Sequence, residues 1–159
     1  MIFVTVGTHH QPFERLLDAL ARLDGDRLVV QYGVGERPAR ASAAAAFMPF
    51  DAMLEHFRAA DVVVTHAGVG SILCAAREGH VPLVVPRSAE LGEHVDDHQI
   101  ELTNALAKRG SVVPVWDVDE LGEAIAHAPP RGSTTVSADP ALCRAVRMAL
   151  GGAPQSSAA

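Results

Sequence analysis

Short apolar runs alternate with helix-like segments along most of the chain. Runs rich in valine, isoleucine and leucine are typical of strands buried on both faces of a parallel sheet. The segments between them carry apolar residues three and four positions apart, which is typical of amphipathic helices. Strands are predicted at 2–6, 28–32, 61–65, 83–86 and 112–115. Helices are predicted at 12–23, 51–58, 69–78, 97–109 and 119–127.

Segment 41–48 fits neither pattern cleanly. Its alanines favour a helix, whereas its length and the following Pro49 favour a short buried strand that ends at Phe47 or Met48. Asp51 is a good N-cap for the next helix. The alternation of strands and helices predicts an α/β fold, with a Rossmann-like parallel sheet, helices on both faces and right-handed crossovers.

The α/β domain is expected to span residues 1–127. Residues 128–138 contain prolines and a glycine and predict a linker. Residues 139–150 have the pattern of an amphipathic helix, and we expect the small-residue tail at 151–159 to be disordered. The sequence does not decide whether the last helix packs on this domain.

Two glycine turns follow predicted strands. One follows the first strand, and the other, His-Ala-Gly-Val-Gly-Ser at 66–71, opens a helix. Backbone N–H groups at a helix start attract anions, and glycine lets a ligand approach them closely. A diphosphate is therefore the expected ligand, although a turn that serves only packing is the alternative. The predicted diphosphate site comprises Gly7, Thr8, His66, Gly68, Val69, Gly70 and Ser71.

A dense polar segment, Glu-His-Val-Asp-Asp-His-Gln, lies at 93–99 after another predicted strand. In a parallel sheet this segment and both glycine turns follow strand carboxyl ends, so all three face one crevice. A carboxylate beside an amide can bind sugar hydroxyls, which both donate and accept. A solvated helix start with Asp96 or Asp97 as N-cap is the alternative. The predicted sugar site comprises Glu93, His94, Asp97, His98 and Gln99.

Composition narrows the classes of function. A chain of 159 residues with 48% hydrophobic content can bury one core. A net charge of −6 and only 4% aromatic residues argue against a nucleic-acid partner. No run reaches the roughly 18 apolar residues that span a bilayer, and no signal peptide is evident, so a cytoplasmic location is expected. Cys74 and Cys143 match no disulfide or zinc pattern and are expected to pack helices.

Five segments carry a resemblance when they are taken together. They are Phe3 to Thr8 with Phe13, Ala60 to Val63, His66 to Ser71, Val85 to Arg87, and Glu93 to Gln99. This combination resembles the donor-binding half of family-28 glycosyltransferases, which have the GT-B fold. It is similar in particular to the small catalytic subunits of split exopolysaccharide glycosyltransferases. It is also similar to the subunit of the eukaryotic enzyme that adds the second N-acetylglucosamine to dolichol-linked chitobiose.

The resemblance implies a UDP-sugar donor. His66 matches a histidine that donates to a phosphate oxygen in related enzymes, and Asp97 and Gln99 match positions that contact the transferred sugar. A glutamate that often holds the ribose in the family falls at about Cys74 here, and Glu78 lies one turn further on. Uridine is expected near the start of the second helix, although phenylalanines in such a domain are often core residues. The predicted uridine site comprises Phe47, Met48, Phe50 and Met53.

The resemblance also implies the reaction. We expect direct displacement with inversion, which moves a hexose from the UDP-sugar to a lipid-linked or polysaccharide acceptor. His9 and His10 are candidates for the general base, unless a partner supplies it. Arg87 is predicted to contact the phosphates or the acceptor, and a surface ion pair is the alternative.

A partner is expected because transferases of this architecture use two Rossmann-like domains and this chain has length for one. A membrane-anchored acceptor-binding subunit would complete the enzyme and place the chain peripherally at the inner membrane face. A homodimer is the fallback. The alternative function is a nucleotide-sugar-binding or regulatory protein without catalysis.

Two other chemistries are disfavoured. His94 and His98 are four residues apart beside Asp96 and Asp97, but the spacing matches no zinc signature, so no catalytic metal or other cofactor is expected. A dehydrogenase would need a third glycine where Leu73 stands and an acid after the next strand.

Overall fold

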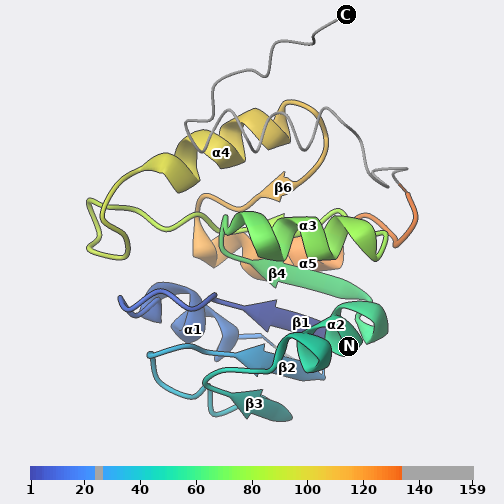
Figure 1. Cartoon of the computed structure of the whole chain (residues 1–159), viewed down its shortest axis with the longest axis horizontal. Coiled ribbons are helices and arrows are strands. Elements are labelled where there is room, and N and C mark those ends of the chain that lie inside the picture. Colours follow the sequence, from blue (N-terminus) through green and yellow to red (C-terminus); the bar gives the residue numbers. More distant parts are fainter. Residues whose placement is uncertain (24–26, 134–159) are drawn as a thin grey trace, which may run out of the picture.

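The chain folds around one six-stranded parallel sheet with the strand order β3-β2-β1-β4-β5-β6 (Figure 1). This computed structural model is described for residues 1–23 and 27–133. The strand order reverses between β1 and β4, as in a doubly wound Rossmann-like fold, so the predicted fold class is confirmed. The strands are β1 (Ile2–Thr5), β2 (Leu28–Gln31), β3 (Ala43–Ala45), β4 (Val62–Thr65), β5 (Leu83–Val84) and β6 (Val113–Pro114).

Helices cover both faces of the sheet. One apolar cluster packs α1 and α5 on the first face, and two clusters pack α2, α3 and α4 on the second. A 3-10 turn, η1 (Val118–Glu120), precedes α5. The helices are α1 (Glu14–Leu20), α2 (Phe50–Ala59), α3 (Val69–Arg77), α4 (His98–Ala107) and α5 (Leu121–Ala126).

Strand β1 shows how the central strands bury both faces. Val4 belongs to the cluster around α1, whereas its neighbour Phe3 belongs to the cluster under α2 and α3. The Phe3 ring meets the Phe57 ring edge to face at 5.0 Å between centroids. Because consecutive side chains point to opposite faces, an uninterrupted apolar run is what a central parallel strand requires.

Three local expectations were wrong. The strand within 41–48 is β3, and none of its residues is buried, because it lies at the edge of the sheet. Pro49, rather than Asp51, is the N-cap of α2, and Asp51 lies in the first turn, where its charge still favours the helix dipole. Asp117, rather than Asp119, begins the last helical segment by accepting a bond from the Asp119 backbone N–H at 2.9 Å.

The first part of the predicted linker is fixed to the domain. The Arg131 guanidinium donates to the carbonyl oxygens of Glu78 at 2.7 Å and Arg58 at 2.5 Å. The Gly132 N–H donates to the Gly79 carbonyl at 2.8 Å. These partners lie at the carboxyl ends of α2 and α3, which is also the end where the Met1 amino group pairs with Asp61.

Several expectations fall outside the described residues. They are the remainder of the linker from 134 to 138, the helix at 139–150, the tail at 151–159, and Cys143. Within residues 1–23 and 27–133, no helix is long and apolar enough to cross a membrane.

Candidate functional site

The loops after β1 and β4 meet at the point where the strand order reverses. The two strands pair in register, and the His66 N–H donates to the Thr5 carbonyl at 3.3 Å. The His66 imidazole fills the space between the two glycine turns. A Cβ atom at Gly7 would lie 2.5 Å from this ring, and one at Gly68 would lie 2.1 Å from it. Gly7 also has φ +78°, so both positions require glycine.

The His66 ring is neutral at physiological pH. Its residue is 9% exposed. Burial, followed by the charge of Arg87, lowers the pKa of His66 to about 4. The ring can therefore offer a ligand a hydrogen bond but not a positive charge.

A cavity of about 300 Å³ opens beside this histidine, and we call it the first cavity. None of its lining side chains carries a formal charge at neutral pH. The N-cap of α3 is Gly68, which has no side-chain cap, so the first N–H groups of this helix are left for a ligand. The first cavity is lined by Thr5, Gly7, Thr8, Gln31, Phe50, Met53, Phe57, His66, Gly68, Gly70, Ser71 and Cys74.

A second cavity of about 340 Å³ adjoins the first at Gly68. It lies between the start of α3 and the loop that leads into α4. Polar side chains from this loop line one wall, and apolar groups line the other. The second cavity is lined by Ala67, Gly68, Val69, His94, Asp96, His98, Gln99 and Leu102.

The structure brings the seven predicted diphosphate residues together, with Val69 on the second cavity and the other six on the first. Two of the four predicted uridine residues line the first cavity, and two do not. Phe50 and Met53 line the first cavity, whereas Phe47 is exposed and Met48 packs against the core near Phe3.

Sequence reasoning missed four residues of the first cavity. Thr5 and Gln31 end neighbouring strands, and the Thr5 hydroxyl donates to the Gln31 amide oxygen. The Gln31 amide N–H donates to the Gly7 carbonyl at 3.2 Å, which fixes the glycine turn. Polar residues at the carboxyl ends of buried strands were the available signal. Phe57 gave none, because apolar helix positions normally face the core. For Cys74 the signal was its match to the position of the family's ribose-binding glutamate.

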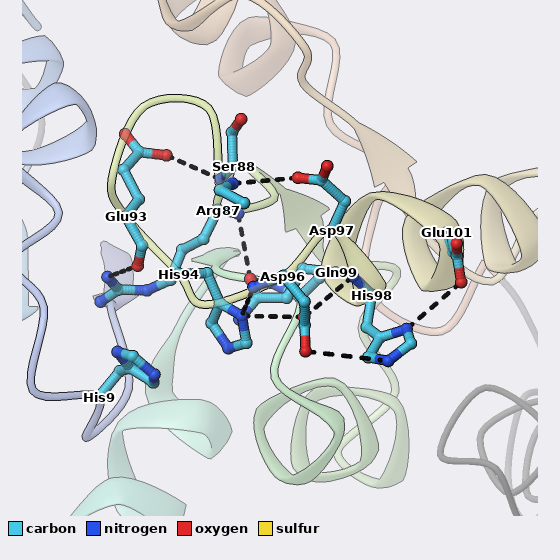
Figure 2. Close-up of polar contacts among 12 residues, drawn as sticks. His9, Arg87, Ser88, Glu93, His94, Asp96, Asp97, His98, Gln99 and Glu101 are labelled. Carbon is cyan, nitrogen blue, oxygen red and sulfur yellow. Dashed lines mark hydrogen bonds and ion pairs between the residues drawn. The ribbon is translucent and has the colours of Figure 1, made fainter.

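Three of the five predicted sugar residues line the second cavity, and two do not. Figure 2 shows the polar contacts of all five. His94, His98 and Gln99 line the second cavity. The Gln99 amide oxygen accepts from the backbone N–H groups of Ala67 at 3.2 Å and Arg87 at 3.1 Å. The amide of Gln99 is thus held in one orientation, with its oxygen turned to the backbone.

Glu93 and Asp97 hold the loop instead of lining the cavity. The Glu93 carboxylate is 6% exposed and accepts two bonds from Arg15, both at 2.9 Å. It also accepts from the Ser88 N–H at 3.0 Å. Asp97 accepts from the Ala89 N–H at 3.0 Å and is the N-cap residue of α4. Both carboxylates are therefore engaged in holding the loop, and Glu93 also ties it to α1 through Arg15.

Arg87 is 1% exposed, so the alternative of a surface ion pair was wrong. Its guanidinium donates to the carbonyl oxygens of Val6 and Gln11 at 2.9 Å and of Glu93 at 3.0 Å. It also lies 4.6 Å from the centre of the Phe13 ring. Burial lowers the pKa of Arg87 to about 10, which leaves it protonated at neutral pH. The guanidinium ties the loops after β1 and β5 together, and its buried Nε has no hydrogen-bond partner among the described residues.

The histidines predicted as bases lie beside the second cavity and line neither cavity. The rings of His9 and His10 stack at 4.4 Å, and His9 also packs on His94 at 4.6 Å. The Gln11 N–H donates to Nδ1 of His9 at 3.2 Å. Burial and the neighbouring His94 lower the pKa of His9.

No cluster of metal-binding side chains is present in the described part of the chain. There, no three or more histidine, cysteine, aspartate or glutamate side chains are arranged to hold an ion. The expectation that no catalytic metal or other cofactor is needed stays a prediction.

A solved structure shares the architecture. The structure of the glycotransferase of kitacinnamycin aligns with a TM-score of 0.56 at 23% identity and covers 95% of this chain and 40% of that chain. At this identity the likeness shows the fold alone.

Sequence relatives carry the name UDP-N-acetylglucosamine transferase subunit ALG13. The protein from Yarrowia lipolytica is 30% identical over 138 residues, which cover 77% of this chain and 68% of that protein. The human protein is 32% identical over 123 residues, 69% of this chain and only 10% of the human one. One from Cryptococcus neoformans is 44% identical over 66 residues, 41% of this chain and 31% of that protein.

A family model accounts for most of the chain. The model of the glycosyltransferase family 28 C-terminal domain matches residues 1–139, which include both glycine turns, both cavities and the loop at 87–97. The chain belongs to this glycosyltransferase family.

Proposed function

We propose that this chain is the donor-binding, catalytic subunit of an inverting glycosyltransferase. It moves a hexose from a UDP-sugar to a lipid-linked or polysaccharide acceptor, together with a second subunit that binds the acceptor. One observation carries the proposal: two adjoining cavities meet at the uncapped start of α3, where a diphosphate would lie between a nucleoside and a sugar.

The charge distribution suits a departing UDP. The first cavity has no charged side chain, so its attraction for a diphosphate comes from the N–H groups and dipole of α3. These dipoles are fixed before the reaction begins, so they can stabilise the charge that grows on the leaving oxygen. His66, which is neutral, adds a hydrogen bond without a competing proton equilibrium at pH 7.

The donor parts are assigned by the lining of each cavity. Uracil and ribose lie in the first cavity against Phe50 and Met53, and the sugar lies in the second cavity against Gln99. The relatives named for UDP-N-acetylglucosamine make this the first donor to test.

The partner assignment is supported by the same relatives, which are named as subunits. A membrane-anchored acceptor-binding subunit would hold the chain peripherally at the inner membrane face. Pull-down of the full chain from its own membranes, followed by size measurement of the complex, distinguishes such a partner from a homodimer.

Calorimetry tests the donor site directly. UDP and UDP-N-acetylglucosamine should bind with one site, and NAD should not. Ser71→Glu places a carboxylate at the start of α3 and should weaken UDP binding more than about 100-fold by repulsion and loss of space. Ser133→Glu, on the exposed segment after α5, is the matched control and should bind UDP like the wild type.

Transfer is tested separately by UDP release in the presence of the partner and a lipid-linked acceptor. UDP release that requires both the partner and the acceptor would support the transferase function. Tight UDP binding with no release under these conditions would favour the non-catalytic binding protein. Absence of UDP binding would refute both.

A further inference from the structure

Helices α2 and α3 give the first cavity an apolar wall. Three residues of α2 and one of α3 form it: Phe50, Met53, Phe57 and Cys74. The three on α2 lie three and four positions apart, so they share one face of the helix. Phenylalanine has no hydrogen-bonding group, and the sulfur groups of methionine and cysteine are weak donors or acceptors. This wall therefore offers a ligand contact area but no strong hydrogen bond.

The ribose of the donor would lie against this wall. In a nucleoside diphosphate the ribose is joined directly to the first phosphate, so it lies about one helical turn from a diphosphate at the start of α3. Cys74 is three residues after Ser71 on that helix, and both line the cavity. Burial raises the pKa of the Cys74 thiol, so the thiol is uncharged at neutral pH.

The polar residues of the first cavity are engaged elsewhere. The Thr5 hydroxyl donates to the Gln31 amide oxygen, and the Gln31 amide N–H donates to the Gly7 carbonyl at 3.2 Å. The Gly7 N–H donates in turn to the Thr5 hydroxyl oxygen at 3.3 Å. The other polar side chains of the lining belong to the glycine turns and the helix start, where the diphosphate is proposed to lie: Thr8, His66 and Ser71.

No carboxylate among the described residues lines the first cavity. Glu78, at the carboxyl end of α3, accepts from the Arg58 guanidinium at 3.2 Å and lies 3.9 Å from that of Arg131. The acidic residues of α2, Asp51 and Glu55, are exposed and do not line the cavity. The described residues thus provide no acidic partner for a ribose hydroxyl.

From this lining we infer that the site does not distinguish ribose from 2′-deoxyribose, and that it takes the diphosphates of 2′-deoxypyrimidine nucleosides as readily as UDP. The inference rests on the proposed function and concerns the nucleoside part of the same donor. A site that hydrogen-bonds a hydroxyl rejects an analogue without it, because the polar groups of the site are then left unpaired. An apolar wall has no such group, so the loss of the hydroxyl costs little.

The same wall accepts the methyl group that distinguishes thymine from uracil. Phe50 and Met53 are apolar, and a methionine side chain adapts its shape to a neighbouring group. A thymidine diphosphate should therefore bind as UDP does.

Calorimetry on the full chain with UDP, 2′-deoxy-UDP and dTDP tests the inference. The Kd of each deoxynucleotide should lie within about fivefold of the Kd for UDP. A greater loss of affinity for either deoxynucleotide, with UDP still bound, would overturn the inference and leave the proposed function intact. If the wild type bound none of the three nucleotides, the proposed function itself would be refuted.

Variants of Cys74 test where the ribose lies. Cys74→Glu adds an acceptor for the 2′-hydroxyl, so the ratio of the Kd for 2′-deoxy-UDP to the Kd for UDP should rise to about tenfold or more. Because both values come from one protein, a loss of affinity shared by the two nucleotides cancels. Arg77→Glu adds the same carboxylate at an exposed position of α3, and this matched control should keep the wild-type ratio.

Cys74→Gln adds an acceptor without charge, and it should raise the ratio even where a carboxylate repels the diphosphate. An unchanged ratio in both Cys74 variants would show that the ribose does not lie against this wall, and the inference would then be wrong.

Discussion

The two cavities sit on either side of the same helix start, yet they are built in different ways. The first cavity is shaped by glycines and one neutral imidazole, and its lining side chains carry no charge. The second cavity is bordered by the loop at 87–97, which is held by Arg87, Glu93 and their partners.

The difference shows how one fold separates two tasks. A leaving group that departs as an anion is best served by main-chain dipoles that cannot titrate. A sugar is recognised through its hydroxyl groups, so a site for one needs polar side chains that are themselves fixed. Close packing around glycines fixes the first region, whereas the Arg15–Glu93 ion pair and the hydrogen bonds of Arg87 fix the second. Mutations in the two regions should therefore affect stability and binding in different ways.

The largest effect is expected at the centre of the charged loop. Arg87→Met leaves at least three carbonyl oxygens without their donor, two of them in buried bonds, and we expect the free energy of unfolding to fall by about 3–5 kcal/mol. Urea denaturation measures this loss. Arg77→Met, on the exposed face of α3, should change it by less than about 0.5 kcal/mol. Equal losses for the two variants would show that the Arg87 bonds do not hold the loop.

The neutral imidazole of the first cavity should produce a pH effect on stability. The pKa of His66 is about 4 in the folded protein and 6.5 in the unfolded chain. Because the unfolded state binds more protons between these values, the contribution is complete above pH 6.5 and is lost as pH falls toward 4. It amounts to about 3 kcal/mol at most.

Unfolding measured from pH 7 to 4 tests this effect. His66→Gln should flatten the dependence, although His80, whose pKa burial also lowers, keeps part of the slope. His127→Gln should retain the wild-type slope. An unchanged slope in His66→Gln would contradict the buried neutral ring.

A pair of glycines isolates the packing effect. Gly7 and Gly110 both have positive φ, but only at Gly7 would a Cβ meet the His66 ring. Gly7→Ala should cost about 2 kcal/mol or more of unfolding free energy, and Gly110→Ala about 1 kcal/mol. When Gly7→Ala is combined with His66→Ala, the ring that the new Cβ would meet is gone. The extra cost of Gly7→Ala over Gly110→Ala should then disappear. Thermal unfolding of the four proteins would show whether it does.

The smallest effect concerns the wall for uracil. Phe47 is 52% exposed and Phe50 is 63% exposed, yet only Phe50 lines the first cavity. Phe50→Ala should weaken UDP binding about tenfold, and Phe47→Ala should leave it within about twofold. Calorimetry with UDP measures both affinities. A larger loss of affinity in Phe47→Ala than in Phe50→Ala would place the uridine site nearer to β3.

The pattern of apolar runs was sufficient for the fold, because buried parallel strands and glycine turns are local features. The residues predicted to bind a diphosphate come together for the same reason, because a glycine turn between a strand and a helix can be recognised from the sequence. The exposure of β3 was not predictable, since the sequence does not show which strand forms the edge. Glu93 and Asp97 illustrate a second limit, because their binding partners are set by tertiary contacts with Arg15 and the loop.

The attachment of Arg131 to the carboxyl ends of α2 and α3 has a practical consequence. Residues 1 and 131 both lie at the pole of the domain opposite the crevice, because helices in this fold run antiparallel to the strands. A label or surface tether joined through residue 1 would lie at the end of the described domain away from both cavities. Binding of UDP and of a candidate partner can therefore be tested on the immobilised chain without a tether at the crevice.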